Sequence, residues 1–387
     1  MKMILKKVKT RDIPADVRYL LWGRSAGRCQ FNGCNKPVWK NPVTQEEVNI
    51  AQAAHIYAFS EDGPRGNAGI EDEDLNSLKN LLLTCHACHK TIDTKGKELR
   101  YSVDLLQKWK ASHEGRIERV TGVDPDHHSH IVLFGRGIGD VRSPLRYDRA
   151  AAAMFPMHYP AADRAIELGK GASERTERDE EFWRLELADL EKRFGRLLLE
   201  PLSDGEVSHL SIFALAPMPL LIRLGTLLTD IRDVEIYQLH RAPKGWEWPS
   251  KERTLTIDLQ QPQSLTGAPA LVISLSATIS EDRINRVLGQ DASIWRLTTP
   301  EPTQECIRSR ADLNAFYLAV LKAMDAIKAA HGESRPLSIF PAAPVSTMVK
   351  LGQARQPKAD LDWIIYDEVK ELGGFVKAIR IGNRSED

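Results

Sequence analysis

Two pairs of cysteines constrain the fold of this chain more than any other feature of its sequence. Cys29 and Cys34 have four residues between them, and Cys85 and Cys88 have two. Both spacings suit tetrahedral thiolate ligation of a structural Zn²⁺ ion. The basic start of the chain contains no apolar stretch of signal-peptide length, so we expect a cytoplasmic protein, in which paired cysteines favour zinc over disulfides. The sequence therefore predicts a small N-terminal module held together by zinc.

Two histidines and an asparagine accompany the cysteines. A strand-like segment carries His55, and 25 residues later Asn80 begins the run Asn-Leu-Leu-Leu-Thr-Cys-His-Ala-Cys-His, which ends at His89. An imidazole that titrates near neutral pH suits a general base, which is the role we predict for His55. We expect the Asn80 amide to hold the loop and orient His55, with Asn76 as the competing candidate. His89 would ligate a divalent cation for phosphodiester hydrolysis.

With the zinc pairs, the Ala-His-Ile around His55 and the Leu-x2-Trp-Lys-x2-His-Glu of residues 106–114, this segment resembles the HNH endonuclease family. The resemblance is to the branch with a four-cysteine zinc site and covers about residues 15–115. It implies an α+β fold of the ββα-metal type and a catalytic Mg²⁺ or Mn²⁺. Many HNH enzymes carry a metal-binding Asp immediately before the base, where this chain has Ala54. The candidates for the missing ligand are Asp74, Gln52 and Asp93.

Charge is distributed unevenly along a chain whose formal net charge is zero. Residues 1–120 carry 20 Lys and Arg against 15 Asp and Glu, a balance of +5, and the remaining residues carry 33 against 38, a balance of −5. A basic N-terminal part suits a polyanionic partner. No apolar run approaches the roughly 20 residues that span a bilayer, so we expect no membrane partner.

Residues 121–130 combine turn-forming residues with no hydrophobic period, and we place the first domain boundary there. We predict a nuclease domain over 1–120, a linker with a first strand over 121–164, and a sensor domain over 165–387. In the boundary segment a solvated linker is favoured over a metal-binding tract for His127, His128 and His130. The isolated Cys306 is expected to be an inert, partly buried thiol.

Strand and helix patterns alternate after the boundary, which predicts an α/β domain with a mostly parallel sheet. In the first 120 residues the expected elements are helices over 14–25 and 102–119, a strand over 48–58 and a strand-to-helix segment over 80–93. Beyond them, short apolar strands are expected at 131–135, 209–215, 233–239, 270–276 and 337–340. Helices are expected at 177–199, 218–230, 280–289 and 311–330.

The C-terminal part contains an internal repeat. Residues 211–225 align without gaps with residues 338–352, and seven of the fifteen positions are identical. Each copy reads as a strand, an Ala-Pro turn and a helix, and each is followed by another aliphatic strand. The repeat predicts two related Rossmann-like halves, about 165–300 and 301–387. Constraints shared by a duplicated folding unit are the alternative explanation.

In open α/β sheets, ligands bind at the carboxyl ends of the strands, and helix N-termini there suit phosphates. The residues that the repeat places at these turns are Pro217, Met218, Pro344 and Ser346. Nucleobases stack on aromatic rings, with about 1–3 kcal/mol per base. The aromatic candidates are Trp246, Trp248, Phe155 and Tyr159, and packing of loops against the sheet is an equal alternative for them.

The duplicated Ile-Phe-x2-Ala-Pro turns, the Leu-Gly that ends each helix and the run from Tyr237 to Trp248 resemble the SAVED family. The resemblance covers about residues 165–387 and implies two fused CARF-like Rossmann halves that sense cyclic oligonucleotides in bacterial anti-phage signalling (CBASS). An HNH domain followed by a SAVED domain is a known effector architecture. It implies a DNase that stays inactive until a cyclic di- or trinucleotide drives formation of a dimer or tetramer.

The expected function is therefore a cyclic-oligonucleotide-activated, metal-dependent endonuclease that degrades double-stranded DNA with little sequence preference. One alternative is a restriction-type HNH nuclease whose C-terminal part reads DNA, although the −5 balance of that part argues against it. Another is a non-catalytic, ligand-responsive DNA-binding regulator that has kept only the zinc scaffold.

Overall fold

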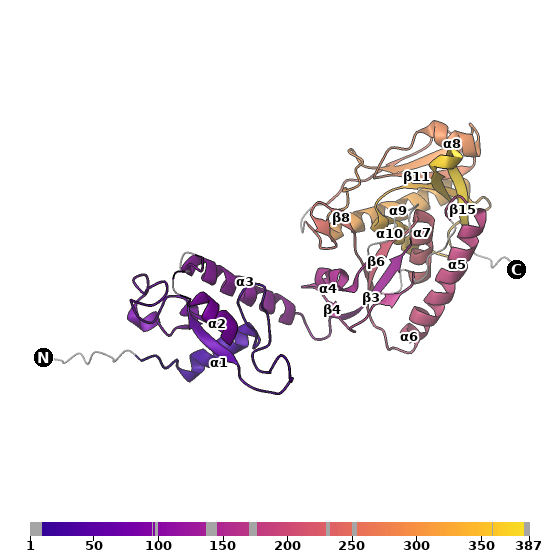
Figure 1. The fold of residues 1–387 in the computed structure, drawn as a ribbon. Coiled ribbons are helices and arrows are strands. Elements are labelled where there is room, and N and C mark those ends of the chain that lie inside the picture. The colour runs from indigo at the N-terminus through magenta and orange to yellow at the C-terminus, as the bar shows by residue number, and fades with distance from the viewer. Residues whose placement is uncertain are drawn as a thin grey trace. The chain divides into compact units, whose positions relative to one another are not determined.

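The computed structural model describes residues 10–94, 96, 100–136, 145–169, 176–229, 233–249, 254–357 and 359–382. The chain divides into two compact units, an N-terminal unit of Met1–Val123 and a C-terminal unit of Asp124–Asp387 (Figure 1). Each unit has hydrophobic clusters of its own.

The N-terminal unit is a two-stranded sheet with helices. Its elements are α1 (Ala15–Ser25), β1 (Ala51–His55), β2 (Leu81–Cys85), α2 (His86–Ile92) and α3 (Val103–Thr121). Strands β1 and β2 are antiparallel, with His55 opposite Leu81, and β2 runs directly into α2. The predicted helices, the strand that carries His55 and the strand-to-helix segment are all confirmed.

Apolar clusters on both faces explain why β2 is a continuous apolar run. Successive strand residues point to opposite faces. Leu81 and Leu83 pack with Leu21 of α1 on one face, and Leu82 packs with Leu106 of α3 on the other. All five residues of β2 are buried as a result.

The first sheet of the C-terminal unit is parallel. Its strands are β3 (His128–Gly135), β4 (Tyr159–Pro160), β5 (Ile166–Glu167), β6 (Leu210–Leu215) and β7 (Val234–Ile236). They lie in the order β4–β3–β6–β7, and β5 also pairs with β3. Because β3 begins at His128, the predicted linker of residues 121–130 is shorter than expected.

The second sheet has four parallel strands and an antiparallel strand at each edge. Its strands are β10 (Asp258–Gln260), β11 (Pro269–Ser274), β12 (Ser293–Thr298), β13 (Leu337–Ala342), β14 (Trp363–Val369) and β15 (Gly374–Ile381). Their order is β10–β12–β11–β13–β14–β15. Strands β11 and β12 lie in the same sheet as β13, so the predicted division between the halves near residue 300 is wrong. A small hairpin, β8 (His240–Arg241) with β9 (Lys244–Gly245), lies outside both sheets.

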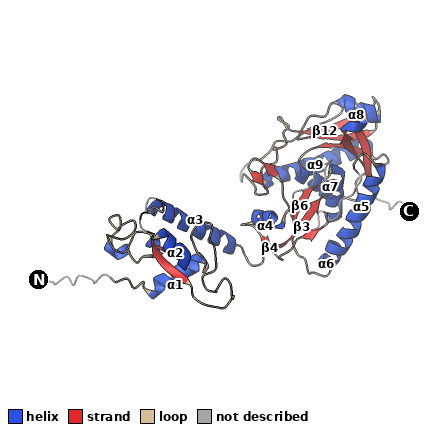
Figure 2. Cartoon of the chain, viewed as in Figure 1, coloured by secondary structure: helices blue, strands red, loops and turns tan. Residues whose placement is uncertain are grey.

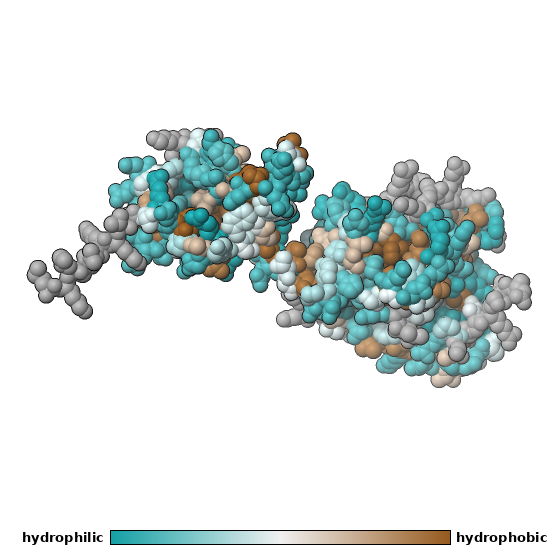
Figure 3. Space-filling view, turned by 90° about the horizontal axis from the view of Figure 1, so that it is seen from below, coloured by the Kyte–Doolittle hydropathy of each residue, from teal (hydrophilic) through white to brown (hydrophobic). Residues whose placement is uncertain are grey.

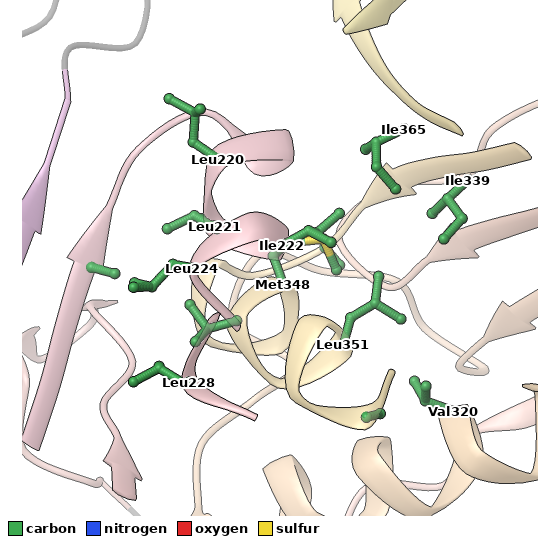
Figure 4. Close-up of a cluster of buried hydrophobic side chains, with 14 of the residues drawn as sticks. Leu220, Leu221, Ile222, Leu224, Leu228, Val320, Ile339, Met348, Leu351 and Ile365 are labelled. Atoms are coloured by element: carbon green, nitrogen blue, oxygen red, sulfur yellow. The ribbon is translucent and has the colours of Figure 1, made fainter. Parts of the chain in front are cut away.

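Helices accompany both sheets (Figure 2). They are α4 (Tyr147–Met154), α5 (Glu180–Phe194), α6 (Glu200–Ser203), α7 (Met218–Leu228), α8 (Glu281–Leu288), α9 (Arg310–His331) and α10 (Val345–Ala354). A π-helical turn, Gly195–Leu199, joins α5 to α6, so the helix predicted over 177–199 is confirmed with this irregularity. Figure 4 shows apolar side chains of α7 and α10 packed together with Val320 of α9 and strand residues Ile339 and Ile365.

Helices α7 and α10 touch at one glycine from each copy of the repeat. A Cβ atom on Gly225 would lie 2.0 Å from the carbonyl oxygen of Val349, and a Cβ atom on Gly352 would lie 2.1 Å from that of Ile222. Val349 and Ile222 occupy equivalent positions in the repeat, so the contact is reciprocal. The two halves are therefore related by a pseudo-two-fold axis that passes between these helices.

The same symmetry relates two groups of aromatic rings. Phe213 stacks on Tyr237 with ring centroids 4.3 Å apart, and Phe340 stacks on Tyr366 at 4.5 Å. The edge of a further ring, Trp246 in the first half and Phe375 in the second, contacts the phenylalanine at 5.2 Å. The two copies of the repeat therefore hold equivalent groups of aromatic rings.

No helix in the described parts of the chain is both long and apolar enough to cross a membrane. On the face shown in Figure 3, most of the surface is hydrophilic and the apolar side chains form small, separate patches.

Candidate functional site

The four predicted zinc ligands come together in the N-terminal unit. The Sγ atoms of Cys29, Cys34, Cys85 and Cys88 all lie within 4.8 Å of one another, and those of Cys34 and Cys85 are 4.0 Å apart. Four thiolates with Zn–S bonds of about 2.3 Å place their sulfur atoms about 3.8 Å apart. The arrangement therefore fits a tetrahedral zinc ion. Cys306 is buried in the core of the C-terminal unit, in agreement with its predicted inert role.

Burial changes the pKa values of these thiols. It raises the pKa of Cys29 to about 12 and also raises the pKa of Cys88. Thiolate is the form that binds metal, so ion binding has to release protons at these positions. Metal affinity should consequently weaken as the pH falls.

His55, at the end of β1, is hydrogen-bonded to Asn76. Its Nε2 atom lies 2.9 Å from Asn76 Oδ1. Asn80 binds backbone instead: its Oδ1 accepts from the Tyr57 N–H at 2.7 Å, and its Nδ2 donates to the carbonyl oxygens of Tyr57 and Leu75 at 3.1 and 2.8 Å. The Asn80 amide thus holds the loop after His55, whereas the direct hydrogen bond to the ring comes from Asn76.

His89 lies in α2, one helical turn before Asp93. Its Nε2 atom is 3.5 Å from Asp93 Oδ2. Burial lowers the pKa of His89, although the Asp93 charge opposes this shift. A neutral imidazole is the metal-binding form, and two ligands of one divalent cation lie about 3 Å apart. Of the three candidates for the missing metal ligand, Asp93 is the one beside His89, while Asp74 and Gln52 have exposed side chains.

Arg65 is a functional candidate that sequence reasoning missed. Its side chain is 3% exposed, and its guanidinium donates to the carbonyl oxygens of His55, Ile56 and Ile92. It also donates to Asp93 Oδ1 at 2.9 Å, so it ties the end of β1 to the end of α2. The available signal was a single arginine inside a Gly-Pro-Arg-Gly turn, where Arg65 adopts a φ of 70°.

The two repeat turns of the C-terminal unit place prolines immediately before helices. Pro217 precedes Met218, the first residue of α7, and Pro344 precedes α10. Ser346 is buried, and both its N–H and its Oγ donate to Gln238 Oε1, at 3.1 and 2.7 Å. Gln238 therefore occupies the start of α10, which sequence reasoning did not anticipate.

The four aromatic ligand candidates occupy different environments. Trp246 is 4% exposed and packs on Phe213, which matches the packing alternative. Trp248 lies beside the ring of His240, and the Tyr159 hydroxyl donates to the Pro125 carbonyl oxygen. Phe155 is half-buried at the end of α4. In the described parts of the chain, no ring contact joins these four side chains.

Histidines gather at the amino ends of β3 and β6. His158 and His209 stack with centroids 4.1 Å apart, and burial with the neighbouring His158 lowers the pKa of His209 to about 4. His130 lies within β3, where burial lowers its pKa. The predicted solvated character of this segment is therefore wrong for His130, because the strand begins earlier than the hydrophobic pattern suggests.

Family comparisons assign both parts of the chain. A model of the HNH endonuclease family matches residues 29–95. A model of the SAVED family, the SMODS-associated sensor domain fused to various effectors, matches residues 190–381. The chain thus carries an HNH endonuclease domain followed by a SAVED sensor domain. The HNH domain indicates a nuclease, that is, a hydrolase.

Solved structures similar to this chain include SAVED/CARF-domain containing receptors named Cap4. The receptor of Acinetobacter baumannii with the cyclic trinucleotide 2'3'3'-cAAA is 14% identical, with a TM-score of 0.43, over 76% of this chain and 62% of that chain. The receptor of Moraxella osloensis is 13% identical, with a TM-score of 0.37, over 82% of this chain and 71% of that chain. The chain thus spans 62% of the A. baumannii receptor in that complex. No curated protein matches.

Proposed function

We propose that this protein is a metal-dependent endonuclease that degrades double-stranded DNA with little sequence preference when a cyclic oligonucleotide binds its SAVED domain. It would act in the cytoplasm in CBASS-type anti-phage defence. The observation that carries the proposal is the presence of an HNH endonuclease domain and a SAVED sensor domain in one chain. The geometry of the N-terminal unit supports the nuclease part.

In the proposed nuclease centre, His55 accepts a proton from the attacking water. His89 and Asp93 would hold Mg²⁺ or Mn²⁺, which stabilises negative charge on the phosphate when it is bound. Arg65 keeps Asp93 beside His89 because it bonds both the carboxylate and the backbone of β1. Asn80 keeps the loop after His55 in place, and the four cysteines would hold Zn²⁺ as a structural ion.

A polar groove next to the zinc site supports contact with the DNA backbone. It has a volume of about 620 Å³ and lies between the turn of Cys29–Cys34 and helix α3. Lys108 and Arg116 line it together with Asn32, Asn35 and the apolar side chains of Phe31, Leu105 and Trp109, and no carboxylate is among the lining residues. The amide of Gln30 also borders it, but this amide is buried and already bonds Glu114 and the backbone of Leu83. Cations and amides without carboxylates suit phosphates, and phosphate contacts carry no sequence information.

For the sensor, we propose that a cyclic di- or trinucleotide binds at the carboxyl ends of β6 and β13, near Pro217, Met218, Pro344 and Ser346. Phosphate oxygens suit the N-termini of α7 and α10. At α10, Ser346 already donates two hydrogen bonds to Gln238, so a phosphate that arrives there has to displace the Gln238 amide. This exchange would be a local step of activation, followed by assembly of a dimer or tetramer.

The test is plasmid cleavage in Mg²⁺ with a panel of cyclic di- and trinucleotides. The proteins are the native chain, His55→Ala and, as a matched control, His127→Ala, which removes an exposed histidine of the C-terminal unit. We expect cleavage with one ligand, its loss in His55→Ala and its retention in His127→Ala. Cleavage without any nucleotide would point to a restriction-type enzyme, and no cleavage under any condition would point to a regulator.

Small-angle scattering tests the assembly step separately. The molecular mass should rise when the activating nucleotide is added. An unchanged mass in the presence of cleavage would remove oligomerisation from the proposal.

A further inference from the structure

We infer that residues 10–12, here called the arm, set the tautomer and the ring orientation of His55 by fixing the side-chain amide of Asn76. The arm precedes α1 and is distant from His55 in sequence. This inference rests on the proposed role of His55 as the general base, and it assigns Asn76 and the arm as positioning groups for that base.

The arm determines which end of the Asn76 amide faces His55. The Asn76 Nδ2 atom donates to the carbonyl oxygens of Thr10 and Asp12, at 2.8 and 3.3 Å. Carbonyl oxygens only accept hydrogen bonds, so they require the NH₂ end of the amide. The oxygen end is left to face His55 Nε2 at 2.9 Å.

The orientation of the amide in turn determines the position of the imidazole proton. An amide oxygen only accepts, so His55 Nε2 has to donate and therefore carries the hydrogen. A neutral imidazole with its hydrogen on Nε2 has its free lone pair on Nδ1. Nδ1 is thus the atom that would take the proton from water.

A second contact from the arm reaches the same ring through an aromatic neighbour. The guanidinium of Arg11 lies 5.5 Å from the ring centroid of Phe59, and the Phe59 ring meets His55 edge-on at 5.8 Å. Within the arm, the Asp12 N–H donates to Thr10 Oγ1 at 3.1 Å, which fixes the path of its backbone. Asn76 and Phe59 therefore connect the arm to two different parts of the His55 environment.

Loss of the arm frees the Asn76 amide to turn over. Its NH₂ end can then face His55, and a donor at that place favours the opposite tautomer, whose lone pair on Nε2 points at Asn76 and away from water. Rotation of an aspartate side chain at position 76 would change nothing for His55, because both carboxylate oxygens accept hydrogen bonds. Asn76→Asp should therefore make His55 independent of the arm.

The experiment compares deletion of residues 1–12 with deletion of residues 1–9, which keeps the arm and controls for the lysines removed with it. Each deletion is made in the native chain and in Asn76→Asp. We expect the longer deletion to lower kcat about 10- to 100-fold relative to the shorter one, the range for a misplaced general base, with little change in KM. In Asn76→Asp the longer deletion should not lower kcat relative to the shorter one, because the carboxylate offers His55 an acceptor in either orientation and donates nothing to the carbonyl oxygens of the arm.

A nuclear magnetic resonance measurement separates this inference from the proposed function. In ¹⁵N-histidine-labelled protein, His55 is assigned by its loss in His55→Ala, and its couplings report which nitrogen carries the hydrogen. We expect the Nε2–H form in the native chain and after deletion of residues 1–9, and a mixture after deletion of residues 1–12. Equal kcat values for the two deletions in the native background, together with an unchanged tautomer, would overturn the inference. A protein that cleaves no DNA would instead overturn the proposed function and leave the tautomer result valid.

Discussion

Asn76 and Asn80 show how two like residues four positions apart acquire different roles. Asn80 ends a 3₁₀ turn, is 2% exposed and uses its whole amide for three backbone hydrogen bonds. Asn76 lies in the preceding, half-buried part of the loop and bonds a side chain and the arm. Asn80 therefore stabilises the fold of the loop, whereas Asn76 orients the His55 ring.

Replacement of Asn80 should separate these roles. Asn80→Ala removes the hydrogen bonds to the partly buried backbone of Tyr57 and the buried carbonyl oxygen of Leu75, so we expect a loss of about 1–3 kcal/mol in the free energy of unfolding of the N-terminal unit. Asn76→Ala should change this free energy by less than about 1 kcal/mol, because Thr10 and Asp12 are exposed to water and His55 is only half-buried, while it slows cleavage. Denaturant unfolding of both variants, with cleavage rates, measures the difference. Equal stability of Asn80→Ala and the native protein would contradict it.

The residues that the sequence predicted are those whose type and spacing are restricted by chemistry. Four cysteines with zinc spacing, and histidines at the end of β1 and in α2, follow from short strand and helix patterns. Arg65 and Asn76 were harder to place, because most of their partners are backbone carbonyl oxygens, such as those of Ile92 and Thr10. Every residue has a carbonyl oxygen, so no residue pattern marks such a contact.

At the scale of elements, the internal repeat indicated equivalent contacts that extend beyond its fifteen aligned residues. Fifteen aligned residues placed β6 with α7 and β13 with α10, and the structure adds the reciprocal glycine contact and the paired aromatic groups. Strands β11 and β12 could not be assigned to a half in this way, because the repeat extends to neither of them. In β12, Arg296 alternates with the buried Trp295 and Leu297 and lies on the half-buried face, where its guanidinium donates to the Ile279 carbonyl oxygen.

The glycine contact gives a prediction at this scale. A methyl group on Gly225 collides with the Val349 carbonyl oxygen, so Gly225→Ala has to push α7 and α10 apart. We expect a loss of about 1–3 kcal/mol in the free energy of unfolding of the C-terminal unit. Gly195→Ala is the matched control: nothing lies within 4 Å of its Cβ position, and the change should be neutral or stabilise by up to about 1 kcal/mol. Denaturant unfolding that ranked the two variants in the opposite order would show that α7 and α10 can separate freely.

The stacked histidines give a pH dependence for the same unit. The pKa of His209 is about 4 in the folded chain, below the 6.5 of a free imidazole, mainly because of burial. The unfolded state therefore binds more protons between these values, and stability should fall as the pH drops from about 6.5 towards 4. His209→Gln should flatten this part of the profile. Thermal unfolding followed from pH 7 to 4.5 measures it, and parallel profiles for the two proteins would exclude His209 as the cause.

At the scale of the whole molecule, the two units are stabilised differently. The N-terminal unit combines two small apolar clusters with the four-cysteine site, whereas the C-terminal unit has an extensive core and no comparable cluster of metal-binding side chains among its described residues. The two units meet at Val123 and Asp124, close to the change in charge balance near residue 120.

Metal removal should therefore affect one unit and spare the other. We expect a zinc chelator to abolish the unfolding transition of the N-terminal unit and to leave that of the C-terminal unit at the same temperature, since structural zinc supplies folding free energy directly. Differential scanning calorimetry with and without chelator, followed by zinc addition, measures both transitions. In the absence of chelator, Cys85→Ser should likewise abolish the unfolding transition of the N-terminal unit. A chelator that left both transitions in place would show that the four thiols do not hold a structural metal.

The reciprocal contact of Gly225 and Gly352 also has an evolutionary consequence. A pseudo-two-fold axis between equivalent helices is the arrangement that duplication and fusion of one gene produce from a symmetric homodimer. In that ancestor, a single glycine would have met its own copy across the axis, so one mutation there altered both sides of the interface at once. After fusion the codons for the two glycines can mutate separately. A side chain at either glycine would still collide with the backbone of the other helix, so Gly225 and Gly352 remain coupled after such a duplication.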